Sequence, residues 1–162
     1  TLSPFALIPE IRKFFDGPVL CSGSISTGDS VAGAIGIGAD MAYVGTRFIA
    51  TDEANADADY KQEIVESSGE DIVYSSLFTG VHGNYLRGSI EKSGMDPDNL
   101  PSADKSSMNF GSGGNTDKKA WKDIWGAGQG VGTIDSSPSV GDVVDTLETE
   151  FNAALARLSA HT

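Results

Sequence analysis

The stretch VLCSGSISTGDSVAGAIGIGADMAYVGTRFIAT, residues 19–51, contains two short apolar runs separated by a segment rich in alanine and glycine. The runs at 18–22 (PVLCS) and 39–45 (ADMAYVG) are flanked or ended by glycine, and such runs predict buried parallel strands. Between them, residues 27–38 predict a helix whose small side chains allow close packing on a sheet. The stretch therefore predicts a βαβ unit and an α/β fold.

Each apolar run ends in a glycine turn, Ser22-Gly23-Ser24 after the first run and Gly45-Thr46 after the second. A glycine at the carboxyl end of a parallel strand lets backbone N–H groups approach an anion, and the next helix points its positive end to the same place. Two adjacent turns predict one phosphate cradle, the arrangement expected after strands seven and eight of a (β/α)8 barrel. For each turn taken alone, tight packing without a ligand explains the glycine equally well.

A helix is predicted at the amino end of the chain. Ser3 is a candidate N-cap, Pro4 suits the first helical position, and Gly17 follows the last apolar residue. Pro9 lies inside this helix, lacks the N–H and crowds the preceding turn. We therefore expect the helix to kink or restart near Leu7.

The rest of the chain predicts two amphipathic helices and one further strand. The first helix lies within residues 54–69, and the strand begins the segment 71–80 (DIVYSSLFTG). The last helix starts at a capping pair, Ser139 and Asp142, and carries an apolar stripe to Leu158. We expect three parts, listed in chain order: residues 1–66 with the last barrel strands and the cradle, residues 67–118 as a small cap or excursion, and residues 119–162 with a loop and a helix returning to the barrel.

The composition excludes several classes of function. A net charge of −12 repels nucleic-acid backbones and anionic membrane surfaces, so neither is an expected partner. The longest apolar stretch is far shorter than the roughly 20 residues of a membrane span. The single cysteine, Cys21, lies in an apolar strand and favours a buried inert thiol over a nucleophile. One unpaired cysteine also fits a reducing compartment, which makes the cytoplasm the expected location.

Four motifs extend the argument beyond general physical chemistry. They are SGSISTGDSVAGAIGIGADMAYVGTRF at 22–48, YKQ at 60–62, LFTGVHGNYLR at 77–87 and WKDIWGAGQGVG at 121–132. Together they resemble the carboxyl-terminal part of the nitronate monooxygenase family, also called 2-nitropropane dioxygenases. The resemblance implies an FMN-binding (β/α)8 barrel that oxidises nitronates or nitroalkanes with dioxygen.

The resemblance also implies which residues bind the cofactor. Backbone amides in the turns Ser22-Gly23-Ser24 and Gly45-Thr46 would hold the FMN phosphate, and Gln129 and Gly130 of the AGQG loop would lie near the cofactor. Ser24 stands where the family commonly has a second glycine. If that position needs a positive φ, the serine is strained by about 1 kcal/mol.

The family's proposed catalytic base, a histidine, is expected upstream of Thr1, as are the earlier strands of a barrel of about 250 residues. We therefore expect this chain alone to be inactive, and to form a homo-oligomer or associate with the missing barrel half. The exposed inner face of the sheet is expected to carry Val19, Cys21, Met41 and Tyr43, or their alternates.

Five other residues have a structural and a functional interpretation. A solvated or structural role is favoured for His82, and His161 is expected to be disordered near the end of the chain. Core packing is favoured over a flavin-lining role for Trp121 and Trp125. Arg47 either pairs with the phosphate or forms a structural ion pair. Metal-ligand spacing is absent, so no metal site is predicted. Two other functions stay open: a flavin-dependent enoyl-thioester reductase of the related barrel group, and a non-catalytic segment that only binds phosphate or assembles.

Overall fold

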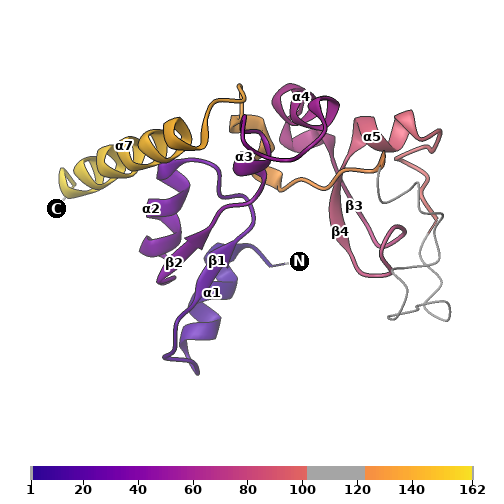
Figure 1. Cartoon of the computed structure of the whole chain (residues 1–162). Coiled ribbons are helices and arrows are strands. Elements are labelled where there is room, and N and C mark those ends of the chain that lie inside the picture. The colour runs from indigo at the N-terminus through magenta and orange to yellow at the C-terminus, as the bar shows by residue number, and fades with distance from the viewer. Residues whose placement is uncertain (1, 102–122, 162) are drawn as a thin grey trace.

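The computed structural model describes residues 2–101 and 123–161. Residues 19–51 include strand β1 (Leu20–Ser22), helix α2 (Gly28–Gly36) and strand β2 (Met41–Tyr43). The two strands are parallel neighbours in a two-stranded sheet (Figure 1). The predicted βαβ unit is therefore confirmed.

Helix α2 begins where the sequence places it because its first turn is capped from within. The Thr27 side chain accepts a hydrogen bond from the Ser30 amide, and the Ser30 side chain accepts one from the Thr27 amide. These reciprocal bonds satisfy amides that a helix end leaves without partners. The cap fixes the point at which the chain leaves the turn after β1.

Helix α1 (Pro4–Arg12) is one uninterrupted helix, with Ser3 as its N-cap. The expected restart near Leu7 is wrong, because the Ser3 carbonyl already accepts hydrogen bonds from Ala6 and Leu7. Pro9 removes a single backbone N–H donor from this helix, and the helix continues beyond Pro9 to Arg12.

The β1–β2 sheet is covered on one face only. Leu20 lies opposite Met41, and Ser22 lies opposite Tyr43. Leu20, Met41 and Tyr43 are 50%, 49% and 60% exposed, whereas Cys21 is 2% exposed. The expectation of two buried strands is wrong for this face.

The register also corrects the expected grouping of inner-face residues. Successive side chains of a strand point to opposite faces, so Cys21 lies on the face of Ala42 and not on that of Met41. Cys21 and Val19 pack in a core cluster with Ile8, Ala34 and Ala39. The exposed face therefore consists of the alternate set, Leu20 and Ser22 with Met41 and Tyr43.

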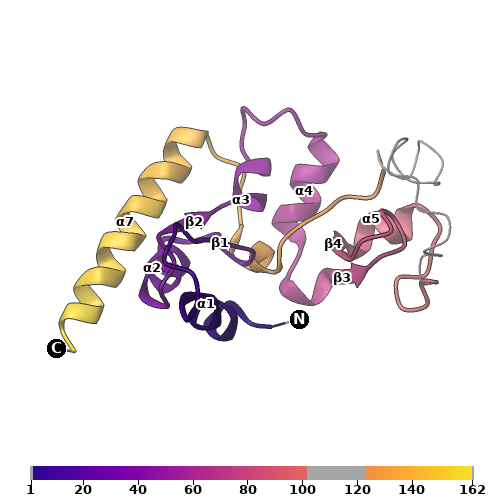
Figure 2. The same ribbon diagram turned by 90° about the horizontal axis from the view of Figure 1, so that it is seen from below.

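The long helix α7 (Val140–Ser159) confirms the predicted final helix and lies alongside α2 in both views (Figures 1 and 2). Ser139 caps it by accepting a hydrogen bond from the Asp142 amide. A Cβ on Gly28 would lie 2.3 Å from the Leu147 carbonyl oxygen. Glycine at the start of α2 is thus required by the close crossing of the two helices.

A second group of elements follows β2. Its members, in chain order, are α3 (Thr46–Ile49), α4 (Ala58–Glu66), η1 (Gly69–Asp71), β3 (Ile72–Ser75), β4 (Gly83–Leu86) and α5 (Arg87–Lys92). The predicted strand after Asp71 and the helix around Tyr60 are confirmed. The pairing of β3 with β4 in an antiparallel hairpin was not predicted.

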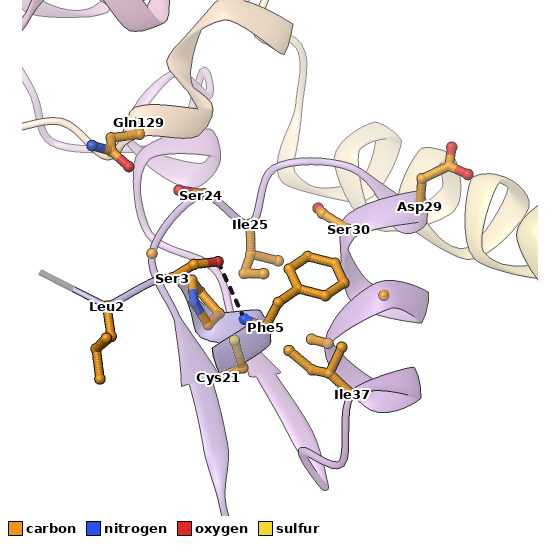
Figure 3. A pocket seen from close by; sticks show the side chains of 14 residues that line it. Leu2, Ser3, Phe5, Cys21, Ser24, Ile25, Asp29, Ser30, Ile37 and Gln129 are labelled. Atoms are coloured by element: carbon orange, nitrogen blue, oxygen red, sulfur yellow. Dashed lines mark hydrogen bonds between the residues drawn. The ribbon is translucent and has the colours of Figure 1, made fainter. Parts of the chain in front are cut away.

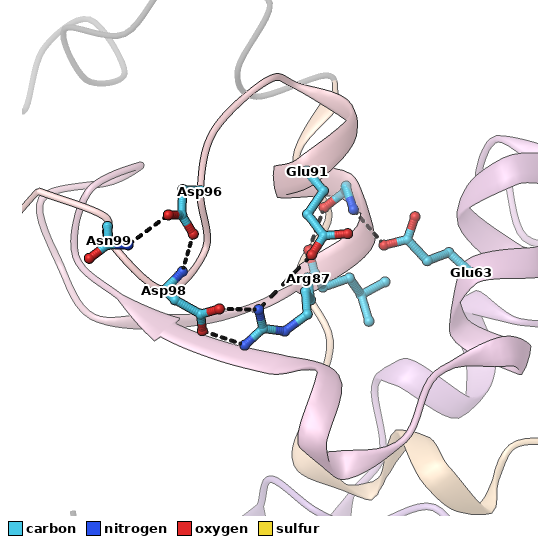
Figure 4. A network of polar contacts seen from close by, with 8 residues as sticks. Glu63, Arg87, Glu91, Asp96, Asp98 and Asn99 are labelled. Carbon is cyan, nitrogen blue, oxygen red and sulfur yellow. Dashed lines mark hydrogen bonds and ion pairs between the residues drawn. The ribbon is translucent and has the colours of Figure 1, made fainter.

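Polar contacts fix the end of this second group. Arg87 forms a two-pronged ion pair with Asp98, at 2.8 and 3.0 Å (Figure 4). Glu63 of α4 accepts hydrogen bonds from the Ser89 amide and the Lys92 ammonium at 2.7 and 3.0 Å. Helix α4 therefore caps the start of α5.

One core cluster draws on all three predicted parts of the chain. Its buried members are Ala50, Ile64, Leu86, Ala127, Val131 and Ile134. The parts share this core, and the three-part division itself stays a prediction. In the described residues, no helix has both the length and the apolar character needed to cross a membrane.

Candidate functional site

The turn after β1 has an unusual backbone. Gly23 and Ser24 both have a positive φ, 89° and 60°. The strain expected at Ser24 is therefore confirmed, at about 1 kcal/mol for a residue with a side chain in this region. Among the described residues, no hydrogen bond uses the Ser24 amide.

The turn after β2 has a different reason for its glycine. Gly45 has a φ of −116°, which any residue can adopt. A Cβ built on Gly45 meets no atom within 4 Å. Within the described part of the chain, the amides of Gly45 and Thr46 also donate no hydrogen bond.

A third segment, which we call the closing loop (Trp125–Gly130), lies against both turns. The Gly128 amide donates to Thr46 Oγ1 at 2.8 Å, and Ser26 Oγ donates to the Gly130 carbonyl at 2.8 Å. A Cβ on Gly130 would lie 2.7 Å from Ser26 Oγ and 3.0 Å from the Ser24 carbonyl carbon. Glycine at this position permits the close approach. The loop continues into η3 (Gln129–Thr133).

The two turns and the closing loop surround one cavity of about 210 Å³. Six of the seven predicted cofactor-binding residues line it: Ser22, Gly23, Ser24, Gly45, Thr46 and Gly130. The seventh, Gln129, lines an adjacent pocket that shares Gly23 and Ser24. The structure thus brings all seven residues together.

Sequence reasoning missed four residues of the small cavity, Ile25, Ser26, Tyr43 and Gly128. Gly128 belongs to the AGQG motif at residues 127–130, so the family resemblance could have identified it. Tyr43 follows from the strand register, because it lies beside Ser22 on the exposed face. No pattern in the sequence singles out Ser26.

The adjacent pocket has a volume of about 530 Å³ and lies between α1, the end of β1 and α2 (Figure 3). Phe5, Ile25 and Ile37 line it with apolar surface, and Cys21 lies among them. Cys21 is buried, as predicted for an inert thiol. This pocket is on the helix-covered face of the sheet, opposite to the face of Tyr43.

The small cavity is lined by no charged side chain among the residues that the structure describes. Two amides at the start of helix α2 already have acceptors within the chain. Its Gly28 amide donates to Glu150 of α7 at 2.7 Å, and the Thr27–Ser30 cap uses further polar groups there. Any anion in this cavity would therefore meet free backbone amides of the two turns and the hydroxyls of the lining serine and threonine residues.

Arg47 is buried and does not line the small cavity. Its guanidinium donates to the Ser136 carbonyl at 3.1 Å, and no ion pair of Arg47 occurs in the described residues. The role of Arg47 is thus structural, but its partner is a carbonyl group. The expected structural ion pair of Arg47 is wrong within the described residues, and its pairing with a phosphate stays a prediction.

The other candidate residues lie away from the small cavity. His82 is exposed and stacks on Tyr74, with ring centroids 4.7 Å apart, which fits its predicted solvated role. His161 is exposed near the end of the chain. Trp125 packs against the main core cluster, as predicted, and Trp121 lies outside the described residues. The described part of the chain contains no group of side chains suited to hold a metal.

Curated proteins give partial matches to this chain. It is 28% identical over 96 residues to a nitronate monooxygenase of Paraburkholderia phytofirmans, across 59% of this chain and 26% of that protein. It is 32% identical over 75 residues to a probable nitronate monooxygenase of Bacillus subtilis, across 46% of this chain and 22% of that protein. The matched segments therefore span about a quarter of these relatives.

Solved structures match over more of the chain. A nitroalkane oxidase from Streptomyces ansochromogenes superposes with a TM-score of 0.74 at 26% identity, across 97% of this chain and 46% of that one. FabK from Thermotoga maritima superposes with a TM-score of 0.73 at 22% identity, across 100% of this chain and 53% of that one. The second likeness shows the fold alone.

The family comparison agrees with the geometry of the site. The sequence profile of nitronate monooxygenase matches residues 1–150, a range that includes both glycine turns and the closing loop. A match over this much of the 162 residues shows that the chain belongs to the nitronate monooxygenase family.

Proposed function

We propose that the protein binds FMN and oxidises nitronates or nitroalkanes with dioxygen. The observation that carries the proposal is the meeting of two strand-end turns and the closing loop at one cavity of about 210 Å³. Membership of the nitronate monooxygenase family supports a flavin cofactor and a small-molecule substrate. The chain spans about half of the solved structures it resembles, so the activity of the whole protein is part of the proposal.

The small cavity suits a phosphate group. Within the described residues, the amides of Ser24, Gly45 and Thr46 have no acceptor, and N–H groups of this kind bind anions. A side chain on Gly45 would extend into open space at the cavity. The volume is below the roughly 300–1,000 Å³ of pockets that enclose a whole drug-sized ligand. The cavity therefore suits the phosphate end of FMN.

In this proposal the chain's residues bind and orient the cofactor. The amides of the turns Ser22-Gly23-Ser24 and Gly45-Thr46 hold the phosphate, and Gln129 and Gly130 lie beside it. Bound FMN would supply the redox chemistry, in which electrons leave the substrate and reach dioxygen. The protein contributes position, backbone dipoles and the exclusion of water from the phosphate.

The small cavity offers little acid–base chemistry. Among the described residues that line it, Tyr43 is the only one with a titratable side chain. Loss of a general base typically lowers a rate by about 10² to 10⁴. We therefore propose that this chain, by itself, does not turn nitronates over.

A flavin titration followed by an oxygen-electrode measurement tests the function. We expect added FMN to bind, with a shifted flavin absorbance spectrum, and to bind more tightly than riboflavin, which lacks the phosphate. A colourless protein that ignores FMN would support the non-catalytic interpretation. FMN-dependent oxygen consumption with propionate 3-nitronate would refute inactivity of the chain while supporting the family activity.

The enoyl-thioester reductase alternative is separated by its co-substrate. That reaction requires a reduced nicotinamide nucleotide, whereas oxidation of nitronates by dioxygen does not. Oxidation of NADH or NADPH that depends on both FMN and an enoyl thioester would favour the reductase. Under our proposal the whole protein, but not this chain by itself, consumes oxygen with FMN and a nitronate in the absence of the nucleotide.

The expected assembly stays a prediction. The exposed face formed by Leu20, Ser22, Met41 and Tyr43 would be covered in a homo-oligomer or by further barrel strands. Light scattering at micromolar concentration checks this, because a clean monomer of 16.8 kDa with a cooperative melt would contradict it.

A further inference from the structure

The closing loop is tied down on two sides. Towards the cradle, Gly128 and Gly130 are held by Thr46 and Ser26, as described above. Away from the cradle, three hydrogen bonds hold the loop to β4 and α5: Leu86 N to Trp125 O at 2.8 Å, Ala127 N to Asn84 O at 3.2 Å, and Trp125 N to Ser89 Oγ at 3.0 Å. The position of the loop at the cradle therefore depends on contacts outside the cradle.

Tyr60 of α4 is the side chain best placed to transmit this dependence. Its ring stacks on Trp125, with centroids 5.1 Å apart and planes 14° from parallel. Its hydroxyl donates a hydrogen bond to the Gly126 carbonyl, two residues before Gly128. Burial raises the pKa of the Tyr60 phenol, so the hydroxyl keeps its proton at neutral pH and remains a donor.

We propose that Tyr60 is a positioning residue for the phosphate cradle, an inference that rests on the proposed function. Its hydroxyl fixes the Gly126 peptide, and this peptide sets the point at which Gly128 meets Thr46. Thr46 contributes one of the free amides of the cradle, so the orientation of that amide follows from the same chain of contacts. Tyr60 does not line either cavity and acts only through the loop.

The variant Tyr60→Phe removes the hydroxyl and keeps the ring that stacks on Trp125. We expect the dissociation constant for FMN, measured by flavin fluorescence, to rise about fivefold, the size of one lost hydrogen bond. The constant for riboflavin should rise less than about twofold, because riboflavin has no phosphate to place. Tyr74→Phe is the matched control, since Tyr74 is exposed and stacks on His82, and it should change neither constant.

Amide hydrogen exchange without any flavin gives a second and independent readout. In Tyr60→Phe, the Ala127 and Gly128 amides should exchange about fivefold faster, while the Val143 amide of α7 exchanges as in the parent protein. If the parent protein fails to bind FMN, the proposed function is wrong, and this exchange measurement alone decides whether Tyr60 positions the loop.

Two results would overturn the inference. One is an equal loss of FMN and riboflavin affinity, which indicates general damage to the fold. The other is unchanged exchange at Gly128. Should Tyr60→Phe not fold, Thr46→Val breaks the same chain of contacts at its cradle end, and it should show the same selective loss of FMN affinity and the same faster exchange at Gly128.

Discussion

The two ends of the β1–β2 sheet differ in whether their backbone polar groups have hydrogen-bond partners. At the amino end, Arg12 donates to the carbonyls of Gly17 and Gly38, both at 2.7 Å, and Asp40 accepts from the Val19 amide at 2.7 Å. At the carboxyl end, the turns of Ser24 and Gly45 leave amides unused in the described residues. Unused donors are costly unless water or a ligand satisfies them, so the open end is where a ligand is expected.

The open end also shows that two glycines in similar places serve different needs. Gly23 has a φ of 89°, so its lack of a side chain permits the backbone conformation. Gly45 has an ordinary φ, and its lack of a side chain leaves the cavity clear. A substitution at each position therefore tests a different property, either the stability of the fold or the affinity for a ligand.

The largest expected effect is at the open end. Gly45→Val places a β-branched side chain at the small cavity, and we expect FMN affinity to fall at least about 100-fold, near 2.7 kcal/mol. The melting temperature should change little, since valine can adopt a negative φ. Flavin fluorescence titration and a thermal melt measure the two quantities. Gly36→Ala on α2, another site with open space, is the control, and retained FMN affinity in Gly45→Val would contradict the cradle.

The next effect is at the amino end of the β1–β2 sheet. There we expect a loss of stability without a loss of FMN affinity. Arg12→Met keeps most of the aliphatic stem but removes the hydrogen bonds to Gly17 and Gly38. We expect the free energy of unfolding to fall by about 1–2 kcal/mol, with FMN affinity unchanged. Urea denaturation gives the free energy. Arg157→Met, which breaks an exposed pair with Asp29, should cost less than about 1 kcal/mol, and an equal loss would argue against a special role for Arg12.

Acid titration tests the contribution of Asp40 at the amino end of the sheet. The hydrogen bond from the Val19 amide, and then the bond from Arg12, lower the pKa of the Asp40 carboxyl below its usual value of 3.8. A carboxyl whose pKa is lower in the folded state than in the unfolded state stabilises the fold at pH values above its unfolded-state pKa. This stability is lost as the pH falls from the unfolded-state pKa through the folded-state pKa. The free energy of unfolding should therefore fall below about pH 4. Asp40→Asn should show a shallower fall, and an unchanged slope would exclude Asp40 as a contributor.

The smallest expected effect is at Ser24. Ser24→Gly relieves a side chain held at a φ of 60°, and the greater freedom of glycine in the unfolded chain offsets part of the gain. We expect a stabilisation of about 0.5–1 kcal/mol. FMN affinity should stay within about twofold, because the amide is retained. Gly23→Ser is the partner variant and should destabilise by about 1 kcal/mol, so a shift of the same sign in both would refute the strain argument.

Several features of this protein could be predicted from the sequence because their causes are local. The capping residues Ser3, Thr27 and Ser139 mark the starts of three helices, since each bonds within a few positions of itself. Alternating apolar runs and glycines predicted β1, β2 and their turns. The family resemblance, with glycine common at the position of Ser24, predicted strain there on the condition of a positive φ, and the structure supplied that φ.

Other features were decided only by the tertiary structure, because they join residues far apart in the chain. The Ser26–Gly130 hydrogen bond and the Glu150–Gly28 bond link positions 104 and 122 residues apart. No local pattern encodes such partners, since they depend on how whole elements pack. For the same reason, the sequence identified the two turns that form the cradle, whereas only the folded chain determined that Glu150 binds the start of α2 and that no charged side chain of the described residues lines the cavity.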